Sequence, residues 1–171
     1  MDLYIIRHAI AVEPGTPGYK DDSQRPLTEK GSQRMVNIAR GLKNLEVRFD
    51  VILSSSYLRA IETANIIIKV LKMDKSQLAI SENLEPMGFP DQLIGEINEN
   101  YSNLDSIAMV GHEPNLSALI SLLVAGDPAL SINMKKGGVC HLSADNLIHE
   151  RRATLEWLMM PKHLIGLGEK D

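Results

Sequence analysis

The 171-residue sequence predicts an open α/β sandwich with a mostly parallel sheet. Short apolar, β-branched runs alternate along the chain with longer segments whose apolar residues recur at helical spacing. The first apolar runs end in polar residues or glycine, as buried parallel strands commonly do. No internal repeat or long linker divides the chain, so we expect one domain over residues 1–171.

The elements of this fold can be assigned in order. Four strands are predicted in the first two thirds of the chain, at residues 3–6, 51–53, 78–80 and 106–110. Residues 13–24 are rich in turn formers and predict an exposed loop, and Thr28 is a candidate N-cap for the helix after it. The serines at 54–56 can cap the second helix. Pro114 and Gly126 suit the start and the C-terminal cap of a later one.

The last third of the chain predicts a hairpin. Residues 139–142 and 154–159 have strand character, and residues 144–146 have the composition of a turn. The preceding Lys-Lys-Gly-Gly at 135–138 is interpreted as a turn before a strand, because the alternative, a phosphate loop, lacks Walker-type spacing. The single cysteine, Cys140, excludes an internal disulfide framework and a cysteine-rich zinc site.

Charge and hydropathy limit the partners. Eighteen Lys and Arg against 22 Asp and Glu give a net charge of −4, which argues against a nucleic-acid or membrane-surface binder. No apolar run approaches the roughly 18–20 residues of a membrane span. The first residues lack the basic region and cleavage site of a signal peptide, so we expect a cytoplasmic protein.

Polar residues follow three predicted strands at their carboxyl ends. Arg7 and His8 follow the first strand, the segment 54–59 follows the second, and Gly111-His112 follow the fourth. Ligands of parallel sheets collect at this edge, so the three segments are expected to meet there. Arginine side chains and helix N-termini both favour anions, and we interpret the meeting point as a phosphate site.

Four motifs resemble those of the histidine phosphatase superfamily, which includes the phosphoglycerate mutases. They lie in the family's order at residues 3–9 (LYIIRHA), 25–31 (RPLTEKG), 54–64 (SSSYLRAIETA) and 110–114 (VGHEP). Residues 84–86 and 156–161 further resemble the small SixA-type phosphohistidine phosphatases. The resemblance implies a three-layer α/β/α sandwich of the phosphoglycerate mutase-like type without a cap domain.

The resemblance also implies roles for the site residues. His8 would be the nucleophile that forms a covalent phosphohistidine, which water then hydrolyses. Arg7, Arg59 and His112 would surround the transferring oxygens and stabilise their charge. Arg25 is a secondary phosphate-binding candidate whose alternative is a structural arginine in a loop. No metal or other cofactor is implied.

The sequence departs from the family pattern at three positions. Ala9 replaces the usual glycine of the signature, and its methyl group should be costly if that backbone position approaches the phosphate or needs a positive φ. Glu62 stands where many relatives carry glutamine; it can orient Arg59 or face solvent, and solvent is the preferred interpretation. Pro86 occupies the place of the general acid, which leaves Glu85 as a weak candidate for that role.

These features favour protein phosphohistidine as substrate. The imidazole of phosphohistidine leaves without the strong proton donor that an alkoxide needs. In addition, neither residues 9–27 nor residues 73–105 leave room for a lid over a small substrate. The expected function is therefore hydrolysis of phosphohistidine on a phosphotransfer protein. A phosphomonoesterase of the same superfamily and a non-catalytic phosphohistidine-binding module are the alternatives, and the oligomeric state stays open.

Overall fold

The structure is a computed structural model that describes residues 1–145, 147 and 153–169. The helices and strands of this part of the chain are β1 (Asp2–Arg7), α1 (Glu29–Asn44), β2 (Val51–Ser54), α2 (Leu58–Leu71), β3 (Leu78–Ile80), α3 (Pro90–Asn100), β4 (Ser106–Gly111), α4 (Asn115–Ala125), β5 (Val139–Ser143), β6 (Thr154–Met159) and α5 (Pro161–Gly168). Short 3₁₀ turns lie at η1 (Asp22–Gln24), η2 (Lys75–Gln77) and η3 (Glu82–Leu84).

The strands of the described residues form one sheet in the order β3-β2-β4-β1-β5-β6. β1, β2, β3 and β4 pair in parallel, whereas β5 runs antiparallel to both of its neighbours. The predicted mostly parallel α/β sandwich is therefore confirmed. In the register of β1 and β4, Arg7 lies opposite Gly111, so the residues that follow these two strands leave the sheet side by side.

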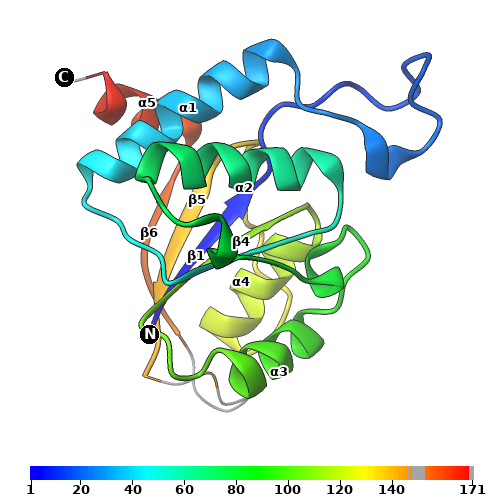
Figure 1. Cartoon of the computed structure of the whole chain (residues 1–171). Coiled ribbons are helices and arrows are strands. Elements are labelled where there is room, and N and C mark those ends of the chain that lie inside the picture. Colours follow the sequence, from blue (N-terminus) through cyan, green and yellow to red (C-terminus); the bar gives the residue numbers. More distant parts are fainter. Residues whose placement is uncertain (146, 148–152, 170–171) are drawn as a thin grey trace.

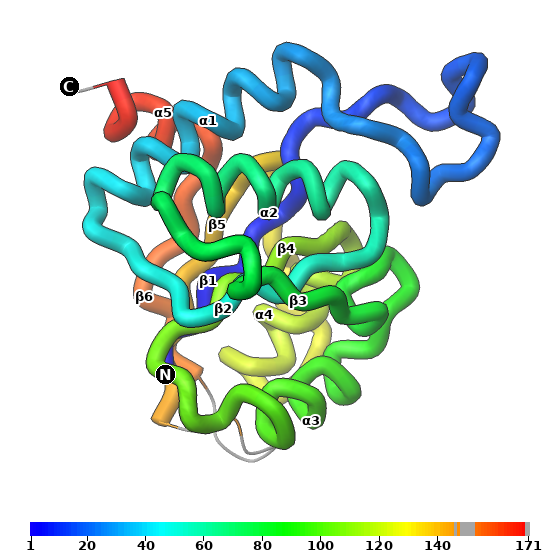
Figure 2. Tube along the Cα trace, viewed as in Figure 1, coloured from blue at the N-terminus to red at the C-terminus, as the bar shows by residue number. Residues whose placement is uncertain are grey.

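Helices cover both faces of the sheet and make three layers (Figure 1). α1, α2 and α5 lie on one face, and α3 and α4 lie on the other. The segment between β1 and α1 extends away from these layers as a long loop, which the tube in Figure 2 shows in blue. No cap domain covers the carboxyl ends of the parallel strands in the described part of the chain.

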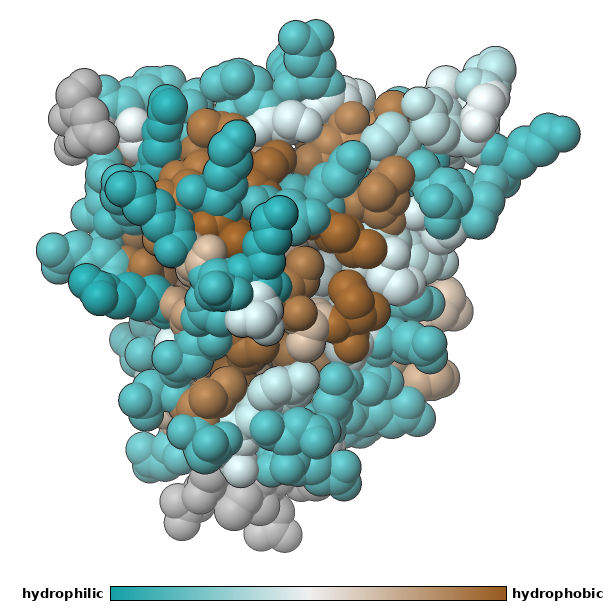
Figure 3. Space-filling view, in the orientation of Figure 1, coloured by the Kyte–Doolittle hydropathy of each residue, from teal (hydrophilic) through white to brown (hydrophobic). Residues whose placement is uncertain are grey.

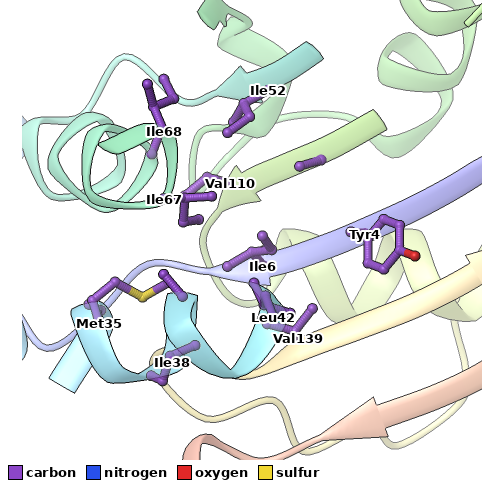
Figure 4. Packing of buried hydrophobic residues seen from close by; sticks show 14 of the residues in the cluster. Tyr4, Ile6, Met35, Ile38, Leu42, Ile52, Ile67, Ile68, Val110 and Val139 are labelled. Carbon is purple, nitrogen blue, oxygen red and sulfur yellow. The ribbon is translucent and has the colours of Figure 1, made fainter. Parts of the chain in front are cut away.

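Alternate residues of β1 point to opposite faces of the sheet, and both faces are buried. This explains why the strand is apolar along its length. Tyr4 and Ile6 pack into the core under α1 and α2, part of which Figure 4 shows. Leu3 and Ile5 pack into the core under α3 and α4. A strand covered on both faces has no solvent side and so shows no polar alternation.

Most of the predicted ends are also observed. Thr28 caps α1, its hydroxyl accepting the Gly31 N–H at 2.9 Å, and Gly126 caps α4 with φ of 80°. The predicted serine cap of α2 is wrong. Tyr57 is the N-cap residue and makes no side-chain cap bond. The Ser55 hydroxyl accepts the N–H of Tyr57 itself at 3.2 Å and also contacts the site described below. The predicted turn at 144–146 lies partly outside the described residues.

Apolar side chains gather in the middle of the face that Figure 3 shows, framed by hydrophilic ones. A groove between α1 and α2 is lined by Val36, Ile66 and Val70 together with charged residues such as Lys69. This groove belongs to the helical layer and not to the strand ends. Within the described part of the chain, no helix has the length and hydropathy needed to cross a bilayer.

Candidate active site

His8 and His112 meet at the carboxyl ends of β1 and β4. The His8 N–H donates to the Gly111 carbonyl at 3.1 Å and so continues the pairing of the two strands. The centroids of the two imidazole rings are 4.9 Å apart, and both side chains are buried. The topology thus brings together two histidines that are 104 positions apart in the sequence.

The protonation of His8 follows from its contacts. Its Nδ1 lies 2.7 Å from the Ala9 carbonyl oxygen, which can only accept, so the proton of the neutral ring is on Nδ1. Burial lowers the pKa of His8 to about 3, and the charges of Arg59, Arg7 and Lys136 act in the same direction. At neutral pH the ring is therefore uncharged and has a free electron pair on Nε2.

Arg59 and Arg7 reach the same strand ends from different elements. Arg59, in the first turn of α2, is buried and stacks on the Tyr57 ring, with 4.8 Å from its guanidinium carbon to the ring centroid. Arg7, the last residue of β1, donates from Nη1 to the Met134 carbonyl at 2.7 Å. The Nε groups of both arginines are buried and have no hydrogen-bond partner in the described residues.

His112 also keeps an unpartnered nitrogen. Its Nε2 lies 2.9 Å from the Ser55 hydroxyl, while its buried Nδ1 contacts no polar atom of the described residues. Burial lowers the pKa of His112 to about 2, with further contributions from His8 and Arg59. At neutral pH His112 is therefore uncharged.

Arg25 is connected to Arg59 through the carboxylate of Asp22. The Arg25 Nε donates to one carboxylate oxygen of Asp22 at 2.7 Å, and the Arg59 Nη2 donates to the other at 3.0 Å. Arg25 also donates to the Val12 carbonyl. The pKa of Asp22 is lowered chiefly by its hydrogen bond from Arg25. The contacts of Arg25 therefore position the Asp22 carboxylate beside Arg59, and a phosphate contact of Arg25 stays a prediction.

Thr63 connects α2 to the segment after β1. Its buried hydroxyl accepts the Ala9 N–H at 3.0 Å and donates to the Arg59 carbonyl at 2.7 Å. A positive φ, one of the two conditions under which the Ala9 methyl group would be costly, is not present: Ala9 does not have a left-handed backbone, and its methyl group lies in the core. The preference for a solvent-facing Glu62 is wrong, because its carboxylate accepts the Leu27 N–H at 2.6 Å.

Glu85 lies beside the start of α2. Its carboxylate accepts a hydrogen bond from the Ser56 hydroxyl at 2.5 Å. The loop that carries it is held by Asn115, whose amide nitrogen donates to the carbonyls of Asn83 and Glu85 at 2.7 and 2.9 Å. The carboxylate is thus hydrogen-bonded to Ser56. The role of Glu85 as a general acid stays a prediction.

Three further residues contact the site although the sequence does not predict a site role for them: Asp22, Ser55 and Thr63. Ser55 and Thr63 belong to the motif around Arg59, and Thr63 lies one helical turn after Arg59, a spacing that places both on one face. That spacing is the signal that could have revealed Thr63. Asp22 has no comparable signal, because it lies in a loop whose path depends on packing.

The arrangement suits a tetrahedral anion. The Nε–H groups of Arg7 and Arg59 and the Nδ1 atom of His112 are buried and have no hydrogen-bond partner in the described residues. Buried donors are normally satisfied, so unpartnered ones at a common edge of the sheet indicate a missing acceptor. A phosphoryl group offers several charged acceptor oxygens, and the free electron pair on Nε2 of the neutral His8 ring has the chemistry of a nucleophile.

Comparisons with known proteins show the family of this chain. Residues 3–91 match the family model described as histidine phosphatase superfamily (branch 1). An uncharacterized protein of a Picosynechococcus species is 32% identical over 143 residues, which cover 83% of this chain and 84% of the relative.

Solved structures match over nearly the whole chain. The protein histidine phosphatase SixA complexed with tungstate has a TM-score of 0.82 at 24% identity, covering 96% of this chain and 99% of the other. The alpha-ribazole phosphatase from Shigella flexneri has a TM-score of 0.75 at 19% identity, covering 94% and 97%. At these identities the two solved structures establish a shared fold only. The match to the family model shows that the chain belongs to the histidine phosphatase superfamily.

Proposed function

We propose that the chain is a phosphohistidine phosphatase that removes the phosphoryl group from histidine of a phosphotransfer protein through a covalent intermediate on His8. The observation that carries the proposal is the Nδ1 contact of His8 with the Ala9 carbonyl, together with the buried Nε–H groups of Arg7 and Arg59, which have no hydrogen-bond partner in the described residues. Together they supply a nucleophile of fixed orientation and donors for the oxygens of the transferring group.

In the first step the His8 Nε2 attacks phosphorus, the Nε2–P bond forms and the substrate N–P bond breaks. A substrate ring protonated on its other nitrogen leaves as neutral imidazole. His8 keeps its Nδ1 proton throughout, and the Ala9 carbonyl stabilises the phosphorylated ring, which is positively charged. Water then attacks phosphorus, the Nε2–P bond breaks, and neutral His8 and inorganic phosphate result.

The choice of phosphohistidine depends on the leaving group. An ester oxygen needs a proton as it leaves, whereas a phosphorylated imidazolium ring does not. Pro86 stands where the resemblance places the acid, and the neighbouring Glu85 carboxylate is bound to Ser56. The structural relatives include both a protein histidine phosphatase and an alpha-ribazole phosphatase, so the fold is compatible with either substrate class.

A direct test compares three substrates: a phosphohistidine-bearing protein domain, an aryl phosphate and a panel of sugar phosphates. We expect the phosphohistidine to be hydrolysed fastest, and His8→Ala to lose at least about a thousand-fold in activity. His163→Ala, which alters an exposed histidine of α5, is the matched control and should retain activity. Rapid quenching should trap an acid-labile, alkali-stable phosphoryl group on His8.

The alternatives give different results in the same assay. Faster hydrolysis of an ester would replace the proposal with a phosphomonoesterase. For that case Glu85 is the residue to test, since Glu85→Gln would then lower ester hydrolysis. Binding of the phosphohistidine domain without turnover of any substrate would indicate a phosphohistidine-binding module. Full activity of His8→Ala would refute the covalent mechanism.

A further inference from the structure

The turn at residues 135–138 is anchored to the nucleophile. The Gly137 N–H donates to the Arg7 and His8 carbonyls at 3.0 and 3.1 Å, and the Arg7 N–H donates to the Gly138 carbonyl at 3.1 Å. Gly137 has a φ of 80°, which favours glycine at this position. These backbone bonds place the turn, and the lysine next to Gly137, at the end of β1.

Lys136 has a weak partner for a partly buried cation. Its side chain is 32% exposed, and its ammonium nitrogen lies 3.7 Å from an oxygen of Glu13, beyond hydrogen-bond distance. The Glu13 side chain is 74% exposed, and exposed ion pairs contribute little stability. The charge of Lys136 nevertheless acts on the nucleophile, because it contributes to the lowered pKa of His8.

The other cations of the site are more strongly engaged. Arg59 and Arg25 share the Asp22 carboxylate through hydrogen bonds of 3.0 and 2.7 Å, which compensates part of their charge. An ammonium group on a four-carbon stem can exchange an exposed carboxylate for a nearby dianion with little rearrangement. A phosphoryl group next to His8 is such a dianion.

We propose that Lys136 is a further substrate-binding residue, which leaves Glu13 and binds an oxygen of the phosphoryl group when substrate enters the site. The inference rests on the proposed function, since it places the phosphoryl group beside His8. It gives the Lys-Lys-Gly-Gly turn a role in phosphate binding through one side chain, without the backbone cradle of a Walker loop.

The test compares Lys136→Met with Lys135→Met, which removes the adjacent, exposed lysine of the same turn. Binding of inorganic phosphate is measured by calorimetry, and kcat/KM is measured with the phosphohistidine domain. Hydrogen bonds to charged groups predict that Lys136→Met weakens phosphate binding and lowers kcat/KM by about 10- to 100-fold. Lys135→Met should stay within about twofold, and Lys136→Arg should recover most of the loss by restoring the charge.

Phosphate binding by Lys136→Met equal to that of the unaltered protein would overturn the inference, as would an equal effect of Lys135→Met. Urea denaturation of each variant separates loss of the charge from loss of the fold. The two proposals fail separately. If the protein binds phosphate through Lys136 but hydrolyses no phosphohistidine, the proposed function is wrong and the inferred phosphate-binding role of Lys136 is still supported. If hydrolysis is normal in Lys136→Met, only the role of Lys136 is wrong.

Discussion

Thr63→Val isolates the hydrogen bonds that join α2 to the segment after His8. Valine has nearly the shape of threonine, so the change removes a hydroxyl without opening a cavity in this fully buried position. The Ala9 N–H, 3.0 Å from that hydroxyl, then has no acceptor. The Arg59 carbonyl loses a bond of 2.7 Å but keeps its helical partner within α2.

The expected cost follows from this difference. One buried N–H left unsatisfied costs about 1–3 kcal/mol, whereas the carbonyl that keeps another bond adds little. The unfolding free energy of Thr63→Val should therefore fall by about 1–3 kcal/mol. The Ala9 peptide also supplies the carbonyl that orients His8 through Nδ1, so its movement should lower kcat/KM about tenfold, equivalent to about 1.4 kcal/mol.

The assay combines urea denaturation, steady-state kinetics and hydrogen exchange at the Ala9 amide. Thr63→Ser is the matched control, because it keeps the hydroxyl and loses only a buried methyl group, at about 1 kcal/mol. Thr63→Ser should keep its kcat/KM and the slow exchange of the Ala9 amide, and Thr63→Val should lose both. The reasoning is refuted if the valine variant is as stable as the unaltered protein, or as active as the serine variant.

Three further predictions concern other parts of the structure. Asp22→Asn should lower kcat/KM about tenfold, because an arginine of the site loses its orienting carboxylate; unchanged kinetics would show that this contact is dispensable. The pKa values of His8 and His112 are lowered from 6.5 to about 3 and about 2, so the unfolded chain binds more protons than the folded one, and stability falls as the pH drops below about 6.5. The free energy of unfolding, measured by urea denaturation between pH 7 and 5, should fall by up to about 1.4 kcal/mol per pH unit for each histidine. A free energy that does not change with pH would contradict the burial of both histidines as neutral groups. Gly41→Ala should destabilise by about 1–3 kcal/mol in thermal or urea unfolding, since its Cβ would lie 2.1 Å from the Leu164 carbonyl oxygen, whereas Gly95→Ala meets nothing within 4 Å and should be tolerated.

Much of the architecture could be predicted from local sequence. The apolar run of β1, the Thr28 cap and the Gly126 cap depend on residues close in the chain, and all three are observed. The start of α2 could not be predicted in the same way. Ser55 is a good capping residue by composition, but its hydroxyl accepts the N–H of the cap residue Tyr57 and contacts His112, 57 positions after Ser55. A contact over that separation leaves no periodic signal.

The sequence by itself determined which polar residues gather and at which edge of the sheet. Arg7, His8, Arg59 and His112 follow their strands in a parallel α/β pattern and lie in segments that resemble the motifs of the family. Only the tertiary structure decided which nitrogen of His8 is free, which cations are already paired, and which lysine of the 135–138 turn has a weak partner. The physical reason is that periodicity and capping report the environment within one element. Tautomer, compensation of charge and the pKa values of buried groups depend on atoms brought together from distant elements by packing.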